Sequence, residues 1–271
     1  MSKLTFLFWN IQRKNLDTHI AQLCKLYDVD VLLLAEFGNN NAYGLESILK
    51  SVQDDYQYIK PFATTKVELF VRFEASKVKQ VYDNPDMSIR KLCIIPTKEI
   101  TMIGLHLPSK LYMTDNDQII HQTNVANLIN TEEQKIGHRN SLVIGDFNMH
   151  PFQMLSAGSF HATMDKNIAL NKKRIVKKEE YYYFYNPMWN FLGDNNKSKV
   201  AGTYYKNMSG EYTNYHWNMF DQVLLRPDLL ANFDENSLEI ITSNGTISYI
   251  KNGKIDTNYS DHLPIKFTLN F

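Results

Sequence analysis

The sequence predicts an α/β protein in which two β-sheets pack face to face with helices outside them. Three observations support this prediction: many apolar runs have strand length, a few segments have helical spacing, and apolar residues suffice for a large core. Hydrophobic residues make up 44% of the 271 residues and aromatic residues 13%, which is typical of globular chains and not of disordered ones. We expect residues 1–271 to form one domain, because large sandwiches and barrels are commonly single units.

The opening of the chain follows a strand, helix, strand pattern. Residues 4–9 and 29–35 are apolar runs of strand length. Between them, four apolar residues recur at helical spacing, namely Leu16, Ile20, Leu23 and Leu26. Segment 44–52 is a second predicted helix, and segment 116–135 is the longest one.

Further strands are predicted from apolar and β-branched runs that are bounded by turn residues. These strands span 68–73, 91–96, 99–107, 141–144, 202–205, 220–225, 238–242 and 265–271. Segment 167–193 gives a weaker pattern, because a basic run, an aromatic run and a proline are mixed there. Many strands with few helices between them favour the two-sheet arrangement.

The composition excludes several classes of protein. Twenty-nine basic residues balance 29 acidic residues, so no overall field draws the protein to a polyanion, which must be held by a local patch. The two cysteines, Cys24 and Cys93, provide no disulfide framework. No apolar run approaches the roughly 18 residues of a membrane span, so we expect a soluble, cytoplasmic protein.

Polar residues stand where the predicted strands end, and buried apolar runs seldom stop at a carboxylate or a histidine by chance. These residues are Asn10, Glu36, His106, Asp146, Asn148, Asp221, Asp261 and His262. If the strand ends converge, the carboxylate and amide oxygens suit a hard cation such as Mg²⁺, Mn²⁺ or Ca²⁺, whereas zinc favours more His and Cys. Each residue taken singly is more simply explained as a turn residue or a structural histidine.

Taken together, these residues lie in six short motifs along the chain. The motifs are FWNIQ (8–12), LLLAEF (32–37), GLHLPS (104–109), VIGDFN (143–148), FDQVLL (220–225) and SDHLPI (260–265). In type and order they resemble the signatures of the endonuclease/exonuclease/phosphatase superfamily, which includes deoxyribonucleases, abasic-site endonucleases, deadenylases, inositol-polyphosphate phosphatases and neutral sphingomyelinases. The resemblance implies a four-layer α/β/β/α sandwich, with two packed mixed β-sheets flanked by helices and the motif loops at one end.

The resemblance also implies a bound Mg²⁺ or Mn²⁺ ion. Glu36 matches the family's principal metal carboxylate, and Asn10 and Asp261 match residues that contribute nearby oxygens. Gln12 stands where some members have an Asp near the metal, which argues against a second cation site.

The remaining motif residues match catalytic residues of the family. His262 matches the catalytic imidazole, and Asp221 matches the carboxylate that fixes its tautomer and favours its charged form. Asp146 matches the residue that orients or deprotonates the attacking water, and Asn148 the amide that holds the phosphate. His106 matches a second histidine, present in part of the family, that contacts the scissile phosphate.

A local patch for a polyanionic substrate is predicted between the motifs of Asn148 and Asp221. Five cations fall within seven residues there, namely Lys172, Lys173, Arg174, Lys177 and Lys178. An aromatic run at 181–185 and Trp189 follow, and such a pattern can track a phosphate backbone and stack unpaired bases. The alternative is a solvated loop followed by core aromatics. Among the other histidines, His150 is the strongest candidate for the site, since it follows Asn148 by two residues.

Three functions are consistent with these features. The first is a metal-dependent nuclease or phosphodiesterase acting on DNA or RNA, supported by the six motifs and the basic and aromatic segment. The second is a phosphatase or phosphodiesterase acting on an inositol phosphate or a phospholipid head group. The third is a non-catalytic module that binds nucleic acid.

Overall fold

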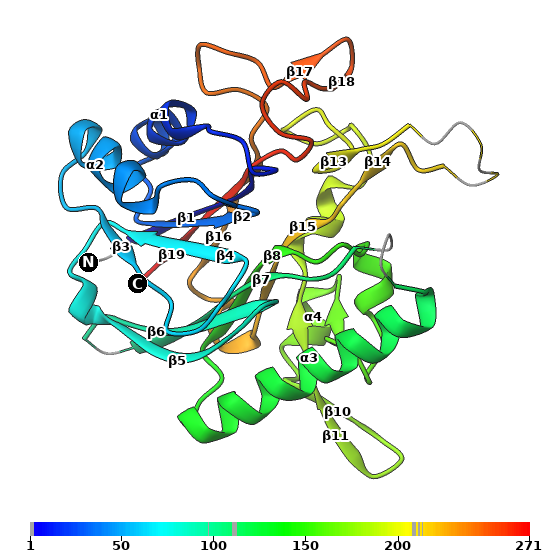
Figure 1. Cartoon of the computed structure of the whole chain (residues 1–271). Helices are drawn as coiled ribbons and strands as arrows, with labels where there is room; N and C mark the ends of the chain where they lie inside the picture. The colour runs from blue at the N-terminus through cyan, green and yellow to red at the C-terminus, as the bar shows by residue number, and fades with distance from the viewer. Residues whose placement is uncertain (1–2, 97, 110–112, 208–209, 211, 213) are drawn as a thin grey trace.

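The computed structural model describes residues 3–96, 98–109, 113–207, 210, 212 and 214–271. Two β-sheets pack face to face and helices cover their outer faces, which confirms the predicted α/β sandwich (Figure 1). The covering helices are α1 (Asp17–Tyr27), α2 (Ala42–Val52) and α3 (Asp115–Ile136). In Figure 1 the layers follow from top to bottom as α1 and α2, the first sheet, the second sheet and α3. Among the described residues, no helix is long and apolar enough to cross a membrane.

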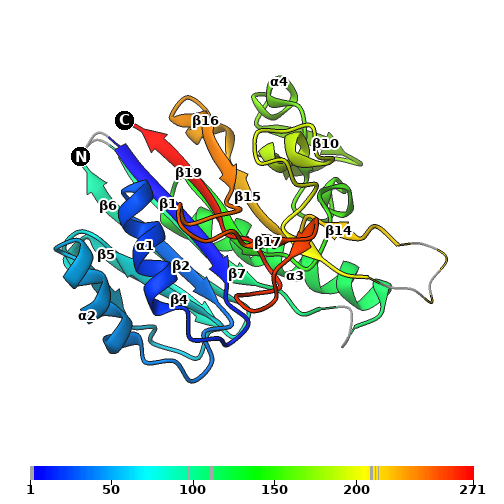
Figure 2. The same ribbon diagram turned by 90° about the horizontal axis from the view of Figure 1, so that it is seen from above.

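In the described part of the chain, the first sheet has six strands in the order β16-β19-β1-β2-β4-β3. Their bounds are β16 (Phe233–Ile240), β19 (Ile265–Asn270), β1 (Lys3–Asn10), β2 (Val31–Ala35), β4 (Val67–Val71) and β3 (Gln57–Ile59). Strands β1 and β2 run parallel, and β19 is antiparallel to β1. Figure 2, seen from above, shows helices α1 and α2 lying across this sheet.

The second sheet, counted over the same residues, has seven strands in the order β5-β6-β7-β8-β15-β12-β9. Their bounds are β5 (Val78–Asn84), β6 (Met87–Ile95), β7 (Lys98–His106), β8 (Ser141–Asp146), β15 (Asp221–Leu225), β12 (Phe184–Tyr185) and β9 (Ala162–Thr163). Strands β7 and β8 are parallel, and β15 is antiparallel to β8. Both sheets are therefore mixed, as predicted.

Because the second sheet is pleated, its apolar side chains point alternately into two hydrophobic cores, one on each face of the sheet. Met102 and Ile144 belong to the core between the sheets, whereas their neighbours Ile103 and Val143 pack in the core under α3. Successive side chains of a strand point to opposite faces, so a strand covered on both faces is apolar throughout. The sheets approach closely at Gly104, where a Cβ atom would lie 2.6 Å from Cδ2 of Leu33.

Helix α3 extends one residue beyond the predicted segment at each end. It starts after Thr114, whose hydroxyl accepts a hydrogen bond from the backbone N–H of Asp117, while Asp117 caps the backbone of Thr114 in return. It ends at Gly137, which adopts a φ of 87°. Val125 and Ile129 face the second sheet and fix the helix on it.

Segment 167–193 contains more regular structure than its sequence predicts. It includes α4 (Lys166–Ala169), a hairpin of β10 (Lys173–Val176) and β11 (Glu179–Tyr182), strand β12 and the 3-10 turn η3 (Pro187–Phe191). The hairpin turns at Lys177 and Lys178, which have φ angles of 49° and 76°. Such turns normally carry Gly or Asn, so their usual sequence signal is missing here.

Several predicted strands differ in extent, and the strand predicted at 91–96 begins four residues earlier, as β6. The strand predicted at 202–205 is reduced to β13 (Tyr204–Tyr205), which pairs with β14 (Trp217–Asn218), and Tyr204 also forms an isolated bridge with His262. The strand predicted at 238–242 begins earlier and ends at Ile240, with a bulge in its polar, exposed first half that hides the strand pattern. A further short hairpin is formed by β17 (Ile250–Lys251) and β18 (Lys254–Ile255).

Candidate active site

The strand registers bring the predicted site residues to one end of the sandwich. Asn10 pairs with Ala35 at the carboxyl ends of the parallel strands β1 and β2. In the second sheet, Asp146 pairs with His106 of the parallel β7 and with Asp221 at the amino end of the antiparallel β15. Because side chains at matched ends of neighbouring strands lie close together, polar groups distant in sequence form one cluster.

Asp146 lies at the centre of this cluster and is only 1% exposed. Its Oδ2 accepts a hydrogen bond of 3.1 Å from Nδ2 of Asn10, which belongs to the first sheet. The Nε2 atoms of His106 and His262 lie 3.6 Å and 3.8 Å from Asp146 Oδ2. One carboxylate oxygen thus faces donors from both sheets.

Gly145 holds Asp146 in this position. A Cβ atom at residue 145 would lie 1.9 Å from the backbone oxygen of Leu105, so no side chain fits between β7 and β8. The glycine of the GDFN motif is therefore a requirement of the strand spacing.

Glu36 follows β2 in a left-handed backbone conformation, with a φ of 49°. This conformation is uncommon for a residue other than Gly, Asn or Asp, and it directs the side chain away from the path of the strand. Its Oε1 accepts a hydrogen bond of 3.2 Å from Asn10 Nδ2 and lies 3.5 Å from His106 Nε2. The bond with His106 lowers the pKa of Glu36 to about 2, with help from Asn10 and against burial, which raises it. Glu36 is thus an anion in the cluster.

Asp221 and His262 form a buried pair. The Oδ2 atom of Asp221 lies 2.7 Å from Nδ1 of His262, and the hydroxyl of Thr203 accepts a hydrogen bond from the backbone N–H of Asp221. Burial raises the pKa of Asp221. Burial alone would lower the pKa of His262, but the carboxylates of Asp221 and Asp146 outweigh it and raise that pKa. The pair favours a protonated imidazole whose Nε2 faces Asp146.

Asp261 joins the cluster through Gln12. Nε2 of Gln12 donates to Oδ2 of Asp261 at 3.0 Å, and the backbone N–H of Gln12 donates to Oδ1 of Asn10 at 3.0 Å. That second bond fixes the Asn10 amide with its nitrogen toward Glu36 and Asp146. Burial raises the pKa of Asp261, and the nearby Glu36 charge raises it further, although His262 opposes this.

Asn148 closes the cluster from the second sheet. Its backbone N–H donates to Oδ1 of Asp146 at 2.8 Å, and its Nδ2 donates to the backbone oxygen of Leu107 at 2.8 Å. Its φ of 49° is well tolerated by asparagine. The second hydrogen of the amide remains available to an anionic ligand.

Two supporting residues were not identified from the sequence. Ser260 donates from its hydroxyl to the backbone oxygen of Asn10 at 2.6 Å and accepts from the backbone N–H of His262 at 3.1 Å. Thr203 binds the backbone of Asp221, as described above. Ser260 stands in the SDHLPI motif and was recognisable there, whereas Thr203 lies in an otherwise ordinary segment.

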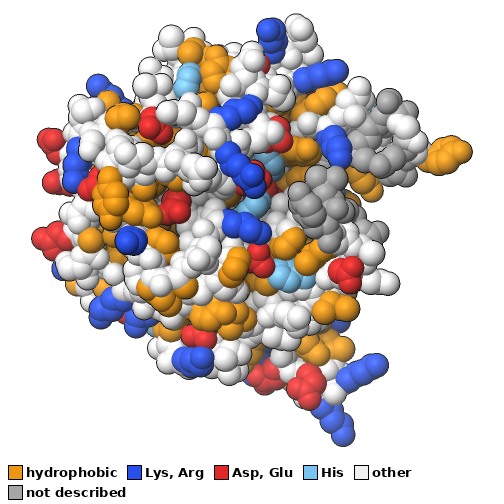
Figure 3. All heavy atoms as spheres, viewed as in Figure 1, with side chains coloured by type: hydrophobic (Ala, Val, Ile, Leu, Met, Phe, Trp, Pro, Cys, Tyr) orange, Lys and Arg blue, Asp and Glu red, His pale blue; other side chains and the backbone are white. Residues whose placement is uncertain are grey.

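The donor set fits a hard divalent cation. Glu36 and Asp261 offer carboxylate oxygens beside the amide of Asn10, and oxygen ligands suit Mg²⁺ and Mn²⁺. A second acidic group lies deeper, since ligand atoms of Asp146, Asp221 and His262 lie within 4.8 Å of one another. There, however, Nδ1 of His262 is engaged by Asp221. That Glu36, Asn10 and Asp261 hold the cation remains a prediction, and Figure 3 shows histidine, acidic and basic side chains together in the middle of the face that it draws.

The basic run does not join this cluster. The register pairs Tyr185 with Leu225, at the end of β15 opposite to Asp221, and the β10-β11 hairpin extends beyond that end. Lys172 pairs with Asp228, and Lys173 pairs with Glu180 within the hairpin. The other members of the run, Arg174, Lys177 and Lys178, lie in the same exposed hairpin, which Figure 1 shows at the lower edge of the molecule. A role in substrate binding remains a prediction for these residues.

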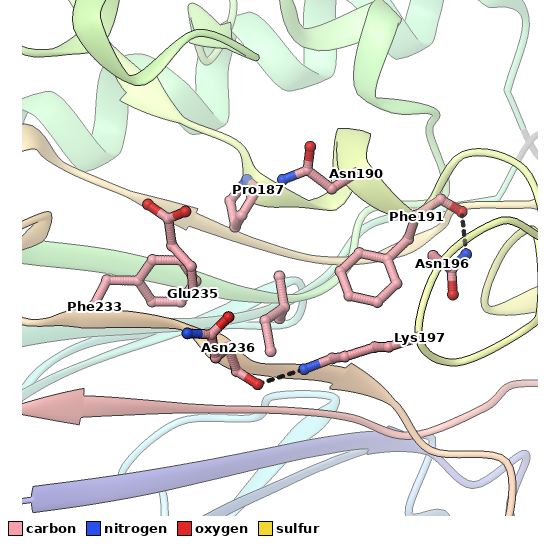
Figure 4. Close-up of a pocket in the computed structure, with 9 residues that line it drawn as sticks. Pro187, Asn190, Phe191, Asn196, Lys197, Phe233, Glu235 and Asn236 are labelled. Carbon is pink, nitrogen blue, oxygen red and sulfur yellow. Dashed lines mark hydrogen bonds between the residues drawn. The ribbon is translucent and has the colours of Figure 1, made fainter.

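Trp189 lies in η3, away from hydrogen-bond contact with the cluster. Within the described ranges its Nε1 is buried without a hydrogen-bond partner. Beside η3 is a cavity of about 240 Å³ between this turn and β16. In Figure 4, Pro187 and Phe191 face Phe233 across it, and Lys197 donates to the backbone oxygen of Asn236 at 2.6 Å. The cavity contains none of the eight motif residues.

Solved structures share this architecture. An endonuclease/exonuclease/phosphatase family protein from Leptotrichia buccalis C-1013-b is 13% identical, with a TM-score of 0.61 over 99% of this chain and 100% of its own. An AP endonuclease from Archaeoglobus fulgidus has the same identity of 13%, TM-score of 0.61 and coverage of 99% and 100%. TDP2 from D. rerio, complexed with a single-strand DNA product, is 17% identical, with a TM-score of 0.58 and complete coverage of both chains at 100%.

No curated protein matches the sequence. The model of the Endonuclease/Exonuclease/phosphatase family matches residues 7–262, which is nearly the whole chain and includes all six motifs. At the level of fold, the solved structures agree with this match. The chain therefore belongs to the Endonuclease/Exonuclease/phosphatase family, whose members are hydrolytic phosphoesterases.

Proposed function

We propose that residues 1–271 act as one domain that hydrolyses phosphodiester bonds of DNA or RNA with a bound Mg²⁺ or Mn²⁺ ion. One observation carries the proposal: Oδ2 of Asp146 faces Asn10, His106 and His262, donors from both sheets, at 3.1–3.8 Å. A buried carboxylate surrounded by donors is suited to hold and activate a water molecule beside a phosphate.

Glu36 and Asp261, with Asn10 beside them, would hold the cation. When bound, it would neutralise charge on the non-bridging oxygens of the phosphate and so lower the barrier to attack. Asn10 keeps Glu36 and Asp146 apart by donating to both. Gln12, which donates to Asp261, is neutral. A carboxylate at this position would bind a second cation, so the glutamine favours a single metal.

His262 would act on the substrate through Nε2, because its Nδ1 is committed to Asp221. A protonated imidazole donates to a phosphate oxygen and stabilises the negative charge that develops there. His106 would contribute a second donor, and Asn148 the free hydrogen of its amide. One general acid or base supplies about 3 to 5 kcal/mol, so several donors and a cation are needed together.

Nucleic acid is the proposed substrate for two reasons. Two solved structures that resemble this chain contain DNA, namely the TDP2 complex and a 3' phosphatase, NExo, from Neisseria bound to a product DNA hairpin. In addition, the rings of Tyr204 and Phe220 lie in a row beside His262, and unpaired bases stack on aromatic rings.

A second candidate is hydrolysis of a smaller phosphoester, such as an inositol phosphate or a phospholipid head group. It is favoured by the position of the basic run beyond the opposite end of β15, so no continuous basic track leads from the run to the cluster. The two candidates share the same eight residues and differ in what binds around them.

The test is hydrolysis of fluorescent single- and double-stranded DNA and RNA with Mg²⁺, Mn²⁺ or EDTA. Asp146→Asn and His262→Ala are compared with His138→Ala, which changes a histidine paired with Glu99 at the surface of the second sheet. We expect metal-dependent cleavage that both cluster variants lose by at least about 10²-fold and that the control retains. Cleavage that persists in both cluster variants would refute the proposal, and turnover of inositol phosphates alone would select the second candidate.

A further inference from the structure

A row of aromatic rings leads from His262 toward the surface. The ring of Tyr204 lies 4.8 Å from that of His262 between centroids, and Phe220 lies 5.3 Å from Tyr204 in a stacked arrangement. His150 follows, with its centroid 5.5 Å from that of Phe220. The row is therefore continuous with the proposed catalytic site.

Two exposed rings end this row. Phe152 stacks on His150, with a centroid distance of 5.0 Å and an interplanar angle of 9°, and Tyr215 lies 4.9 Å from His150 on a tilted plane. Phe152 is 44% exposed and Tyr215 is 58% exposed, whereas His150 is buried.

The support under the exposed rings is well defined. Nε2 of His150 lies 3.0 Å from Oδ1 of Asn218, and the backbone N–H of His150 donates to Gln153 at 2.8 Å. The 3-10 turn η2 (Pro151–Met154) then presents Phe152. This turn starts three residues after Asn148, so the position of Phe152 is coupled to that of Asn148.

We propose that Phe152 and Tyr215 form a stacking subsite for an unpaired base of a single-stranded nucleic acid, and this inference rests on the proposed nuclease function. Exposed rings offer a flat apolar face that every base can stack on. Four ring contacts of about 5 Å separate Phe152 from His262. The subsite therefore serves a neighbouring nucleotide and not the one that carries the scissile phosphate.

The experiment combines ring removal with base removal. Phe152→Leu and Tyr215→Leu are assayed with a fluorescent single-stranded oligonucleotide and with copies in which an abasic residue replaces each base in turn near the scissile phosphate. We expect each variant to lose roughly 5- to 150-fold in kcat/KM on the intact strand, mainly through KM. At one position the abasic residue should lower the kcat/KM of the wild type by a similar factor, and it should lower that of the combined variant Phe152→Leu with Tyr215→Leu by almost nothing further.

A control and two contrary outcomes complete the experiment. Ile175→Ala removes an apolar side chain that is 67% exposed in the distant β10-β11 hairpin, and it should change neither substrate's turnover. If the ring and base losses simply add at every position, the rings act only on structure and the subsite is refuted. If the wild type hydrolyses bis(p-nitrophenyl) phosphate but no oligonucleotide, the proposed nuclease function fails, and this inference fails with it.

Discussion

The two regions that carry the chain's most conspicuous charged residues differ in how those charges are held. In the cluster around Asp146, the carboxylates and imidazoles are wholly or largely buried, and Asp146 and Glu36 face partners from both sheets. In the β10-β11 hairpin, Lys173 pairs with Glu180 across a two-stranded ladder open to solvent. Exposed pairs of this kind contribute little energy, whereas buried convergent groups are costly and persist for chemistry. Charge density along the sequence is thus a weaker guide than convergence in space.

The largest expected effect comes from Asp221→Asn, which keeps the shape of the side chain and removes the charge beside His262. We expect kcat on an oligonucleotide to fall by about 10³ to 10⁴, because the imidazole loses the partner that fixes its tautomer and favours its charge. Asp228→Asn, which removes the partner of Lys172 near the hairpin, is the matched control. Equal activity of the two variants would contradict the difference between the regions.

Arg226 lies at the base of the hairpin. Its substitution should lower the stability of the fold and leave the catalytic cluster unchanged. It is 1% exposed and binds Glu133 as well as the backbone oxygens of Tyr182 and Tyr183. We expect Arg226→Met to lower the free energy of unfolding by about 3 kcal/mol, because the buried Glu133 loses one of its two arginine partners and keeps Arg139, while two backbone oxygens lose their donor. Denaturant unfolding measures the loss, and the double variant with Glu133→Leu should recover most of it. A double variant as unstable as the single one would show that the pair is not the cause.

Glu36→Gln tests the proposed cation site. It is isosteric and removes the charge of a carboxylate with a pKa of about 2, so Mn²⁺ binding measured by calorimetry should weaken by about 100-fold. Glu99→Gln, in a surface group with Lys91 and His138, should leave the affinity unchanged. Unchanged binding in Glu36→Gln would move the site to Asp146, Asp221 and His262.

His161 gives the region under the hairpin a pH dependence. Burial and the charge of Arg174 lower the pKa of His161 to about 4, whereas an unfolded histidine titrates near about 6.5. As pH falls, the histidine of the unfolded state takes up a proton before that of the folded state. Neutral His161 therefore favours folding fully above about pH 6.5, and this stabilisation is lost as pH falls toward 4. After allowance for solvent screening, wild type should lose about 2 kcal/mol more than His161→Phe between these values in denaturant unfolding. Parallel curves for the two proteins would refute this.

The smallest effect is expected for the hairpin cations. Because they lie beyond the opposite end of β15, Lys177→Ala with Lys178→Ala should change kcat/KM for an oligonucleotide by less than about twofold and leave its salt dependence unchanged. A tenfold loss of kcat/KM with a shallower salt dependence would instead show that the basic run binds the substrate. The two regions would then not differ in function.

Much of the fold and of the cluster was predictable from the sequence, because both depend on apolar runs. Runs that end abruptly at Asn10, Glu36 and Asp146 mark strand ends, and parallel pairing then brings those ends together. The hairpin was not predictable, since its strands alternate no apolar face and its turn uses two lysines with positive φ. Thr203 was missed because its hydroxyl accepts from the backbone N–H of Asp221, and a threonine far away in the sequence gives no signal of such a contact.

The placement of the cluster across two sheets determines when it can form during synthesis of the chain. Asn10 lies in β1 of the first sheet, Glu36 directly follows β2 and His262 precedes β19, whereas the remaining three residues, His106, Asp146 and Asp221, lie in strands of the second sheet. The ribosome synthesises Asp146 well before His262, and His262 is positioned only when β19 inserts between β16 and β1. A nascent chain that ends before His262 lacks one of the cluster residues. Hydrolysis can therefore begin only after synthesis has passed the last motif. The order of the motifs thereby delays completion of the cluster until the last strand of the first sheet is in place.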